Sequence, residues 1–373
     1  MTSGATIGLL INPIAGMGGR VGLKGTDGPE ILARARELGA MPMAGDRALQ
    51  AMRELVDKAG DLQIKCPAGE MGEAVVGTLG IAPQLISHSE SDFTTSADTI
   101  RSARHMADAD VDLLLFVGGD GTARDIVTAI GNDLPVLGIP AGVKIHSAVY
   151  AKTPLAAAKL AGRFLNSNSR SCREAEVLDI DEENYRNGRL NTRLYGYLKV
   201  PLDRRWTQGL KAGSPIGDQA EQQGIADAVI ANLEQDCCYI IGPGSTTAAI
   251  LNRLDLPKTL LGVDLLYNRQ LVEQDLNEAE LLMAIAGKKT KIIVTPIGGQ
   301  GFIFGRGNQQ ISPTVLRQVG RDNLQIIATR RKILELEGRS LLIDTGNAEL
   351  DRVLAGYYKI ITGFNDRIVY KAE

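Results

Sequence analysis

Hydrophobic residues in the first half of the chain form short runs that alternate with longer amphipathic stretches. A short apolar run bounded by turn residues is typical of a strand that is buried on both faces of a sheet. The segments that predict strands are Ile7–Ile11, Gln63–Cys66, Gln84–Ser87, Val111–Val117 and Pro135–Pro140, and those at both ends of this series and at Val111–Val117 are such apolar runs. The stretches that predict helices are Pro29–Leu38, Gly45–Ala59, Gly69–Leu79, Thr95–Met106, Ala123–Ile130 and Pro154–Leu165. This alternation predicts a parallel, doubly wound sheet, whose ligands bind at the carboxyl ends of the strands.

The pattern changes near Glu174, where the strand-like runs no longer alternate with long helices. Ala175–Ile180 and Leu194–Val200 flank Asn187-Gly188, a dipeptide that favours a hairpin turn. A helix is expected at Gly217–Glu234. Further strands are expected at Tyr239–Ile241, Leu260–Leu266 and Lys291–Thr295, and near Gln325, Leu341 and Tyr358.

The predicted fold class is an α/β N-terminal domain with a parallel doubly wound sheet plus a β-rich C-terminal domain. We expect residues 1–150 to form the α/β domain. Residues 151–345 are expected to form a β-rich domain for substrate binding and oligomerisation. Residues 346–373 are expected to form a C-terminal segment that returns to the first domain.

Composition narrows the possible functions. The chain has 373 residues and a formal net charge of -3, so it lacks the general basic field of a nucleic-acid-binding protein. Its four cysteines are not spaced as a metal site, and buried thiols in a reducing compartment are expected. No apolar run reaches the ~18 residues that span a bilayer. These features predict a soluble cytoplasmic protein with no stable membrane association.

The turn Gly118-Gly119-Asp120-Gly121-Thr122 follows the fourth predicted strand and precedes a helical pattern. Glycines let the backbone approach a phosphate closely, and a helix N-terminus adds N–H donors. A carboxylate and a phosphate repel each other, so a carboxylate in a phosphate-binding turn calls for a chemical explanation. Asp120 suits a general base for an acceptor hydroxyl or a metal-side ligand. The alternative is a tight strand-to-helix turn in which Asp120 is only a cap.

A second turn of this kind is Gly242-Pro243-Gly244-Ser245-Thr246-Thr247, where hydroxyl and N–H groups suit a phosphate or a ribose. The alternative is an ordinary cluster of helix-capping residues. Neither turn matches the Walker A or the complete dinucleotide pattern. Two such turns in one chain favour a phosphotransferase with donor and acceptor in a cleft between the domains.

Further candidates lie in loops rich in glycine or polar residues. The first glycine-rich loop is Gly16–Gly28. Within it, Lys24 and Asp27 are candidates for contact with phosphate and Mg²⁺, and Thr26 precedes Asp27. The tentative acceptor-binding residues are Lys144, His146, Asp264, Asn277, Glu278, Gln300, Arg306 and Asn308. For these residues, helix caps, surface groups or oligomer contacts remain alternatives.

At these turns the chain resembles a known family. The Gly118–Thr122 turn is similar to the signature of ATP-dependent NAD kinases, whose superfamily includes diacylglycerol and sphingosine kinases. Asn12-Pro13-x-Ala15-Gly16 resembles their first-strand loop, and Gly244-Ser245-Thr246 resembles their second glycine-rich loop. The segments Asn12–Gly28, Gly138–Lys144 and Gly299–Pro313 look like the AcoX-type branch.

The resemblance implies that Asp120 activates a hydroxyl of NAD or a related nucleotide, with ATP or polyphosphate as donor and Mg²⁺ as helper. Together with the residue patterns above, the resemblance points to phosphate or nucleotide binding by Asn12, Gly16, Lys24, Thr26, Asp27, Gly118, Gly119, Gly121, Thr122, Gly244, Ser245, Thr246 and Thr247. It also implies a homo-oligomer, either a dimer or a tetramer.

The chain departs from the family in the acceptor pocket. The Asn-Glu or Asn-Asp pair that grips the ribose in this family is absent between Asp120 and Gly244, and Asn277-Glu278 comes after the second turn. Two alternatives therefore remain open: a kinase of another small hydroxyl metabolite or lipid, and a non-catalytic nucleotide-binding regulator.

Overall fold

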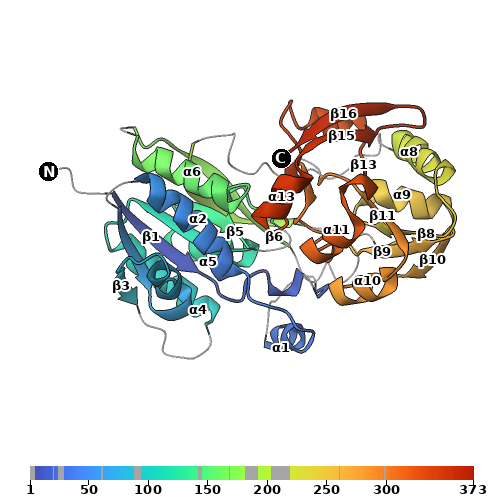
Figure 1. Cartoon of the computed structure of the whole chain (residues 1–373). Coiled ribbons are helices and arrows are strands. Elements are labelled where there is room, and N and C mark those ends of the chain that lie inside the picture. Colours follow the sequence, from blue (N-terminus) through green and yellow to red (C-terminus); the bar gives the residue numbers. More distant parts are fainter. Residues whose placement is uncertain are drawn as a thin grey trace. The chain divides into compact units, whose positions relative to one another are not determined.

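The computed structural model describes residues 5–19, 21–23, 29–59, 62–87, 94–141, 145–167, 169–180, 192–202, 219–259, 261–297 and 300–373. The chain divides into two compact units, which Figure 1 draws with their helices and strands labelled. Unit 1 consists of Met1–Met17 and Met41–Leu210. Unit 2 consists of Gly18–Ala40 and Lys211–Glu373.

Within the described residues, unit 1 contains a five-stranded parallel sheet with the order β3-β2-β1-β4-β5. Its strands are β1 (Ala5–Ile11), β2 (Leu62–Pro67), β3 (Gln84–Ser87), β4 (Leu113–Gly118) and β5 (Val136–Pro140). Its helices are α2 (Ala44–Ala59), α3 (Glu73–Gly77), α4 (Ser96–Ala107), α5 (Asp120–Ile130) and α6 (Pro154–Leu165). The strand order changes direction between β1 and β4, the position where doubly wound sheets bind ligands. The predicted parallel α/β domain is confirmed.

Helices cover both faces of this sheet, which is why its central strands are apolar throughout. Leu113, Leu115 and Val117 of β4 pack in one cluster with residues of α2 and α6. Leu114 and Phe116 pack on the opposite face with residues of α4 and α5. Figure 1 shows α2 and α6 side by side on their face of the sheet.

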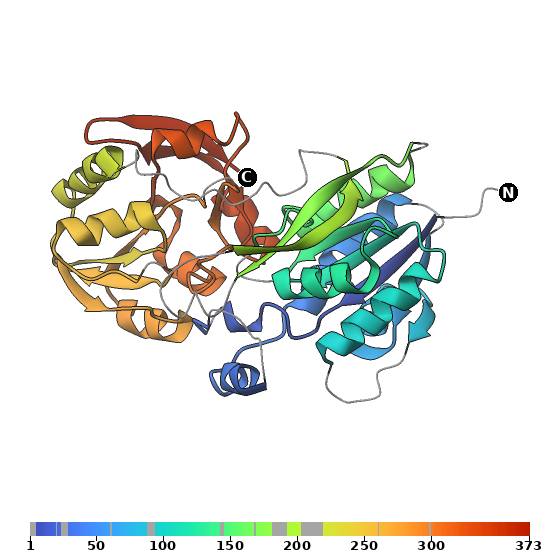
Figure 2. The same ribbon diagram turned by 180° about the vertical axis from the view of Figure 1, so that it is seen from behind.

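The predicted hairpin is present and belongs to unit 1. Its strands are β6 (Cys172–Ile180) and β7 (Thr192–Pro201), and Asn187-Gly188 lies outside the described residues. Val177 and Leu198 are buried in the same cluster as Phe116, and Figure 2 shows the hairpin beside α5. Unit 1 therefore extends beyond the predicted boundary at residue 150, because the apolar side of the hairpin packs on α5 and β5.

In the part of unit 2 that the structure describes, a seven-stranded sheet has the order β10-β9-β8-β11-β13-β15-β16. Its strands are β8 (Cys237–Ile241), β9 (Asp264–Tyr267), β10 (Gln270–Glu273), β11 (Lys289–Val294), β13 (Leu324–Ile327), β15 (Gly356–Ile361) and β16 (Arg367–Ala372). A separate parallel pair joins β12 (Phe302–Phe304) and β14 (Leu342–Ile343). The helices are α1 (Pro29–Glu37), α8 (Gln219–Ala231), α9 (Ser245–Arg253), α10 (Glu278–Ile285), α11 (Pro313–Val319), α12 (Arg330–Leu334) and α13 (Ala348–Leu354). The predicted β-rich second domain is confirmed.

The centre of the unit 2 sheet is parallel and its edges are antiparallel. Neighbouring strands run parallel from β8 through β11 and β13 to β15, whereas β9, β10 and β16 pair antiparallel. The segment 346–373 lies in unit 2 rather than in unit 1, which differs from the prediction. Its strand β15 pairs with β13, and Ile360 and Ala372 are buried in the core of unit 2.

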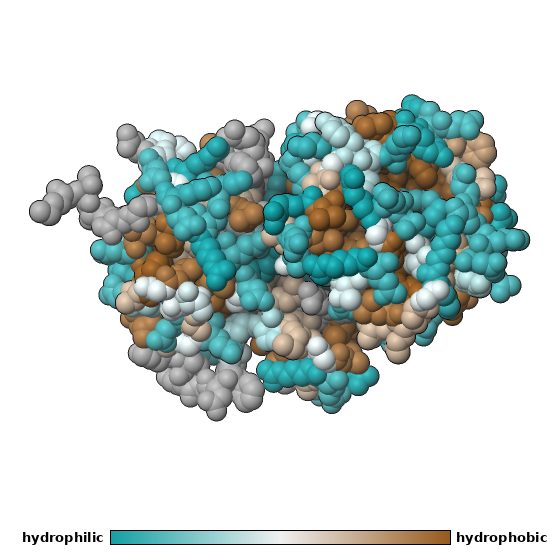
Figure 3. Space-filling view, viewed as in Figure 1, coloured by the Kyte–Doolittle hydropathy of each residue, from teal (hydrophilic) through white to brown (hydrophobic). Residues whose placement is uncertain are grey.

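The surface and the thiols agree with the composition. Cys66, Cys237 and Cys238 are buried and free, as predicted, whereas the free Cys172 is only partly buried. Figure 3 shows hydrophilic residues interspersed with smaller hydrophobic areas on the face that it draws. Among the helices in the described ranges, none combines the length and the apolarity needed to cross a membrane.

Candidate functional site

The Asp120 turn connects β4, which lies between β1 and β5 in the unit 1 sheet, to helix α5. Strand β4 ends at Gly118, Gly119 is the N-cap, and α5 begins at Asp120 itself. The helix therefore starts three residues before the predicted Ala123, because tertiary contacts outweigh the weak helix propensity of Gly121. This start places the Asp120 carboxylate in the first helical turn, where the helix dipole favours negative charge.

Gly118 is required because the helix folds back closely on the strand end. A Cβ atom added at Gly118 would lie 2.3 Å from Oγ1 and 2.5 Å from Cβ of Thr122. Thr122 is buried, and its Oγ1 accepts a 3.0 Å hydrogen bond from Nδ2 of Asn12. Asn12 also follows β1, so this hydrogen bond joins the two strand ends between which the strand order reverses.

This close approach gives a stability prediction. We expect Gly118→Ala to lower the free energy of unfolding by about 1–3 kcal/mol, because the added methyl group overpacks the buried Thr122. Gly77→Ala is the matched control, since a Cβ atom at Gly77 in α3 meets nothing within 4 Å. Urea denaturation followed by circular dichroism compares the two variants. Equal stability of Gly118→Ala and the control would contradict the close approach.

The carboxylate of Asp120 holds the backbone of a neighbouring segment. Its Oδ2 accepts the N–H of His146 at 2.6 Å, and its Oδ1 accepts the N–H of Ser147 at 3.0 Å. Asp120 is 6% exposed, and burial raises the pKa of its carboxyl from 3.8 to about 7. The nearby charge of Asp179 acts in the same direction as burial, whereas the hydrogen bonds from residues 146 and 147 lower this pKa. Asp120 can therefore exchange a proton near neutral pH.

Tyr150 supports the turn from behind, and no local motif in the sequence marks it. Its hydroxyl donates to the carbonyl oxygen of Gly119, and its ring meets Phe116 edge-on at 5.2 Å between centroids. Gly138 of β5 makes room for this ring, because a Cβ atom there would lie 2.4 Å from the tyrosine Cδ1. Tyr150 thus positions the backbone on the N-terminal side of Asp120.

The second glycine turn follows β8 in unit 2. Gly244 is the N-cap of α9 and has φ 121° and ψ 161°, a conformation that disfavours side chains. Thr247 Oγ1 donates to the carbonyl oxygen of Gly244 at 2.8 Å, and Ser245 is the first helical residue. Thr246 and Thr247 are fully buried. The turn therefore combines an α-helix N-terminus with the hydroxyl side chains of Ser245, Thr246 and Thr247.

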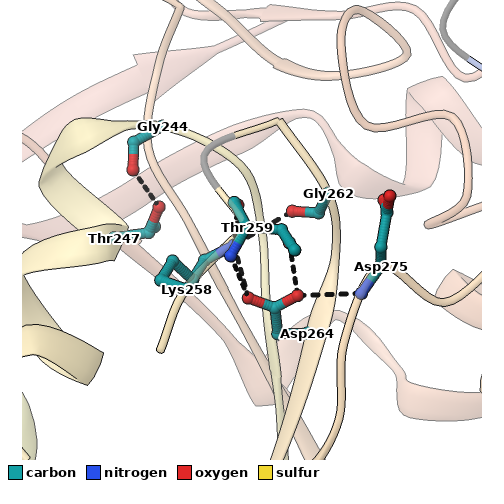
Figure 4. A network of polar contacts seen from close by, with 7 residues as sticks. All are labelled: Gly244, Thr247, Lys258, Thr259, Gly262, Asp264 and Asp275. Atoms are coloured by element: carbon teal, nitrogen blue, oxygen red, sulfur yellow. Dashed lines mark hydrogen bonds and ion pairs between the residues drawn. The ribbon is translucent and has the colours of Figure 1, made fainter. Parts of the chain in front are cut away.

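Asp264 lies beside this turn, because it pairs with Ile241 at the end of β8. Its Oδ2 lies 3.0 Å from Nζ of Lys258 and accepts the N–H of Thr259 at 3.0 Å, while its Oδ1 accepts the N–H of Asp275 at 2.9 Å. Figure 4 shows these groups around the carboxylate, close to Gly244 and Thr247. Both side chains of the ion pair are buried, so Asp264 braces the strand end.

Asn277 and Glu278 begin α10. Asn277 Oδ1 accepts the N–H of Glu280 at 3.1 Å, and the Glu280 side chain accepts the N–H of Asn277 at 2.8 Å. This capping box accounts for Asn277 as a helix cap, and Glu278 lies half-buried in the first turn. The turn at Gly22 approaches this cap, since a Cβ atom at Gly22 would lie 3.7 Å from Cβ of Asn277.

Gln300, Arg306 and Asn308 are buried in the loops around β12. The guanidinium of Arg306 lies 4.8 Å from the ring centroid of Phe302, and its Nε lies 3.9 Å from a carboxylate oxygen of Asp344. Asn308 accepts the N–H of Gly305 at 3.1 Å and donates to the carbonyl of Ile303 at 2.8 Å. These contacts stabilise the loop.

The remaining candidates are distributed as follows. Asn12, Gly118–Thr122 and the backbone of His146 come together in unit 1, and Gly16 lies in the turn after β1 with φ 82°. Lys24, Thr26, Asp27 and Lys144 lie outside the described residues. Among the residues that the structure describes, no group of three or more His, Cys, Asp and Glu side chains is arranged to hold a metal ion.

A small pocket of about 210 Å³ lies elsewhere, lined by Lys288, Lys289, Thr290, Gln318, Val319 and Asn323. It is at the amino end of β11, opposite the end where parallel sheets bind ligands. The turns at Asp120 and Gly244 are better candidates, because both follow the carboxyl ends of parallel strands.

Comparisons with known proteins agree with this geometry. The family models for the ATP-NAD kinase N-terminal domain and the ATP-NAD kinase C-terminal domain match residues 7–169 and 234–371, respectively. Neither the search of curated proteins nor the search of solved structures gave a match. The first range contains the Asp120 turn and the second contains the Gly244 turn. Because the two ranges together cover well over half of the chain, the protein belongs to the ATP-NAD kinase family.

Proposed function

We propose that this protein transfers a phosphoryl group from ATP to a hydroxyl of NAD or a related nucleotide, with Asp120 as the general base. Family membership supports a phosphotransferase. The observation that carries the proposal is the Asp120 carboxylate, which is buried in a glycine turn and has a pKa of about 7. A general base works best when its pKa lies near the working pH.

The chemistry follows from the position of this carboxylate. Ionised Asp120 takes the proton of the acceptor hydroxyl while that oxygen forms a bond to the γ-phosphorus of ATP. The bond between the γ-phosphorus and the bridging oxygen breaks, ADP leaves, and the proton stays on Asp120. The two backbone N–H groups and the Ser147 side chain use three of the roughly four acceptor directions of the carboxylate, so one direction remains for the hydroxyl proton.

The phosphate groups of ATP are held by backbone N–H groups in this proposal. The α5 N-terminus has 11 helical residues behind it and favours an anion, and the glycines allow close approach. Mg²⁺ enters as the MgATP substrate, since phosphate oxygens supply most of its ligands in kinases.

We also propose that the protein belongs to the AcoX-type branch of the family and that it forms a homo-oligomer, either a dimer or a tetramer. Light scattering would measure the mass of this oligomer.

One experiment tests the activity. The protein is incubated with ATP, Mg²⁺ and a mixture of NAD, NADH and small hydroxyl metabolites, and new phosphorylated species are identified by mass spectrometry. A phosphorylated dinucleotide supports the proposal. If another metabolite is phosphorylated instead, the protein is a kinase with that metabolite as its acceptor. Liposome co-sedimentation would test a lipid acceptor. ATP binding without any turnover would point to a regulator and would contradict the kinase.

The pKa of Asp120 predicts the pH dependence of the reaction. Below about 7 the carboxyl is protonated and cannot accept the hydroxyl proton, so kcat/KM should rise with pH and level off above this value. Initial rates measured across the pH range at limiting acceptor give the midpoint. A profile that stays flat on both sides of neutral pH would contradict Asp120 as the base.

A further inference from the structure

The two N–H groups that bind the Asp120 carboxylate belong to a segment without a helix or strand of its own. This segment, residues 145–148, lies between β5 and the bridge that joins Tyr150 to Gly138. It presents the N–H groups of His146 and Ser147 to the two carboxylate oxygens. A segment that lacks regular backbone hydrogen bonds needs another support to keep such donors in one position.

Strand β6 supplies this support. The N–H of Ala148 donates to the carbonyl oxygen of Glu176 at 2.9 Å. The hydroxyl of Ser147 accepts the N–H of Leu178 at 3.0 Å and donates to the carbonyl oxygen of the same residue at 2.8 Å. Nη2 of Arg173 donates to the carbonyl oxygen of Ala148 at 3.2 Å. These contacts dock the 145–148 segment on β6.

Ser147 joins the carboxylate to β6 through its own atoms. Its side chain is fully buried, and its N–H donates to Oδ1 of Asp120 at 3.0 Å. Its hydroxyl also reaches the carboxylate and lowers the pKa of Asp120. A hydroxyl carries one proton, so the carbonyl oxygen of Leu178 and the carboxylate of Asp120 share this donor. Alanine at this position would keep the N–H group but lose the anchor on β6.

An ion pair connects β6 to the helix of Asp120 a second time. Asp179 follows Leu178 in β6 and accepts a 3.0 Å hydrogen bond from Nη1 of Arg124. Arg124 lies one turn after Asp120 on α5, and residues with this spacing share a helix face. The contacts therefore run from Asp120 through Ser147 to β6 and return to α5 at Arg124.

The groups around the carboxylate act in opposite directions on its protonation. Burial raises the pKa of Asp120 to about 7, the hydrogen bonds from residues 147 and 146 lower it, and the charge of Asp179 raises it. Among the described residues, the polar groups come from the 145–148 segment, from β6 and from α5: His146 and Ser147, Asp179, and Arg124 and Asp125. Weaker hydrogen bonds from Ser147 would therefore raise this pKa, whereas greater exposure to water would lower it.

We propose that Ser147 is a positioning residue, which holds the Asp120 carboxylate in one orientation because its hydroxyl is anchored on β6. Three donors fix the plane of the carboxylate, so its remaining acceptor direction points to one place. A reacting group that is held in this way loses little freedom when the reaction takes place. The use of this orientation for proton transfer rests on the proposed function.

The test follows the titration of Asp120 without ATP or acceptor. The full chain is labelled with ¹³C at its aspartate carboxyl groups, and the Asp120 signal is identified by its absence from Asp120→Asn. In Ser147→Ala, the midpoint of this signal should rise by roughly 0.5–1 pH unit, the equivalent of one hydrogen bond. A general loosening of unit 1 would instead expose the carboxylate and lower the midpoint.

Ser102→Ala is the matched control. Ser102 is also buried in unit 1, and its hydroxyl lies 3.0 Å from that of Ser87. The control should leave the midpoint unchanged. In the kinase assay, Ser147→Ala should lower kcat roughly 10- to 100-fold, the effect of a misplaced reacting group, with little change in ATP affinity. Thermal unfolding of each variant accompanies both measurements.

Arg173→Met keeps the test decisive if Ser147→Ala does not fold. This variant removes only a half-buried side chain that binds the Ala148 carbonyl, so the hydroxyl of Ser147 stays. The midpoint of Asp120 should rise here too, by less than in Ser147→Ala. An unchanged midpoint in this variant would then overturn the support by β6.

A folded Ser147→Ala whose Asp120 midpoint stays the same or falls would overturn the positioning role. This outcome is separate from the proposed function. If no acceptor is phosphorylated but the midpoint of Ser147→Ala rises, Ser147 positions Asp120 and the kinase is wrong. If phosphorylation occurs and a folded Ser147→Ala changes neither the midpoint nor kcat, the kinase is supported and the positioning role is wrong.

Discussion

The Asp120→Asn variant is expected to transfer phosphate roughly 10²- to 10⁴-fold more slowly than the unchanged protein, the range of general-base contributions. An amide cannot take the hydroxyl proton, so the loss should appear in kcat, whereas the affinity for ATP should change little. Steady-state rates give kcat, and calorimetry without acceptor gives the ATP affinity. The rise of the rate through neutral pH should also disappear.

The control for this variant is Asp112→Asn. Asp112 precedes β4, so it stands at the opposite end of the strand from Asp120, and its Oδ2 also accepts a backbone N–H, that of Thr6, at 2.8 Å. Like Asp120→Asn, Asp112→Asn weakens a hydrogen bond between a carboxylate and a backbone N–H group in unit 1. It should nevertheless leave kcat unchanged. A similar loss of kcat in both variants would show that Asp120 acts only through stability. Full activity of Asp120→Asn would refute the general base.

The Asp264→Ala variant is expected to lose about 3–5 kcal/mol of stability in unit 2, the usual cost of leaving one member of a buried ion pair alone. Its partner Lys258 is 1% exposed, and the N–H groups of Thr259 and Asp275 would also lose their acceptor. Burial already lowers the pKa of Lys258, and Asp264 opposes this effect, so the lysine of the variant would favour its neutral form. Chemical denaturation followed by circular dichroism measures the loss.

A paired replacement tests the cause of this loss. Lys258→Met combined with Asp264→Leu removes both charges and should recover much of the stability, because apolar side chains can replace a buried pair. Asp366→Ala, which removes an exposed partner of Arg330, should change stability little. If Asp264→Ala were as stable as Asp366→Ala, Asp264 would not brace the strand end, and its predicted role in acceptor binding would become the better explanation.

Local patterns located most helices and strands. Strand β3 and helix α6 have their predicted bounds, and Thr95 caps α4 as expected. These features depend on neighbouring residues alone: an apolar run between turns, or a proline behind a capping threonine. The Gly118–Thr122 turn could be predicted for the same reason.

Features that depend on distant residues were not predictable. The hairpin of β6 and β7 was expected, but its packing on α5 joins segments about 50 residues apart, such as the ion pair of Arg124 with Asp179. The segment after residue 345 lies in unit 2, whereas the sequence pattern suggested a return to the first domain. The pairing of β13 with β15 that holds this segment cannot be recognised from the local sequence. Lys332 and Thr295 look like ordinary helix and strand-end residues until their hydrogen bond brings them together.

The discontinuous course of unit 2 has a consequence for synthesis in the cell. Residues 18–40 are made early, but the rest of unit 2 begins only at residue 211. At ribosomal speed, the first segment waits on the order of tens of seconds for its packing partners. Helix α1 has nine residues, and a helix of this length is marginal in water by itself. Unit 1 can form its hydrophobic core first. Residues 18–40, in contrast, cannot pack in their native position until the C-terminal half of the chain has been synthesised.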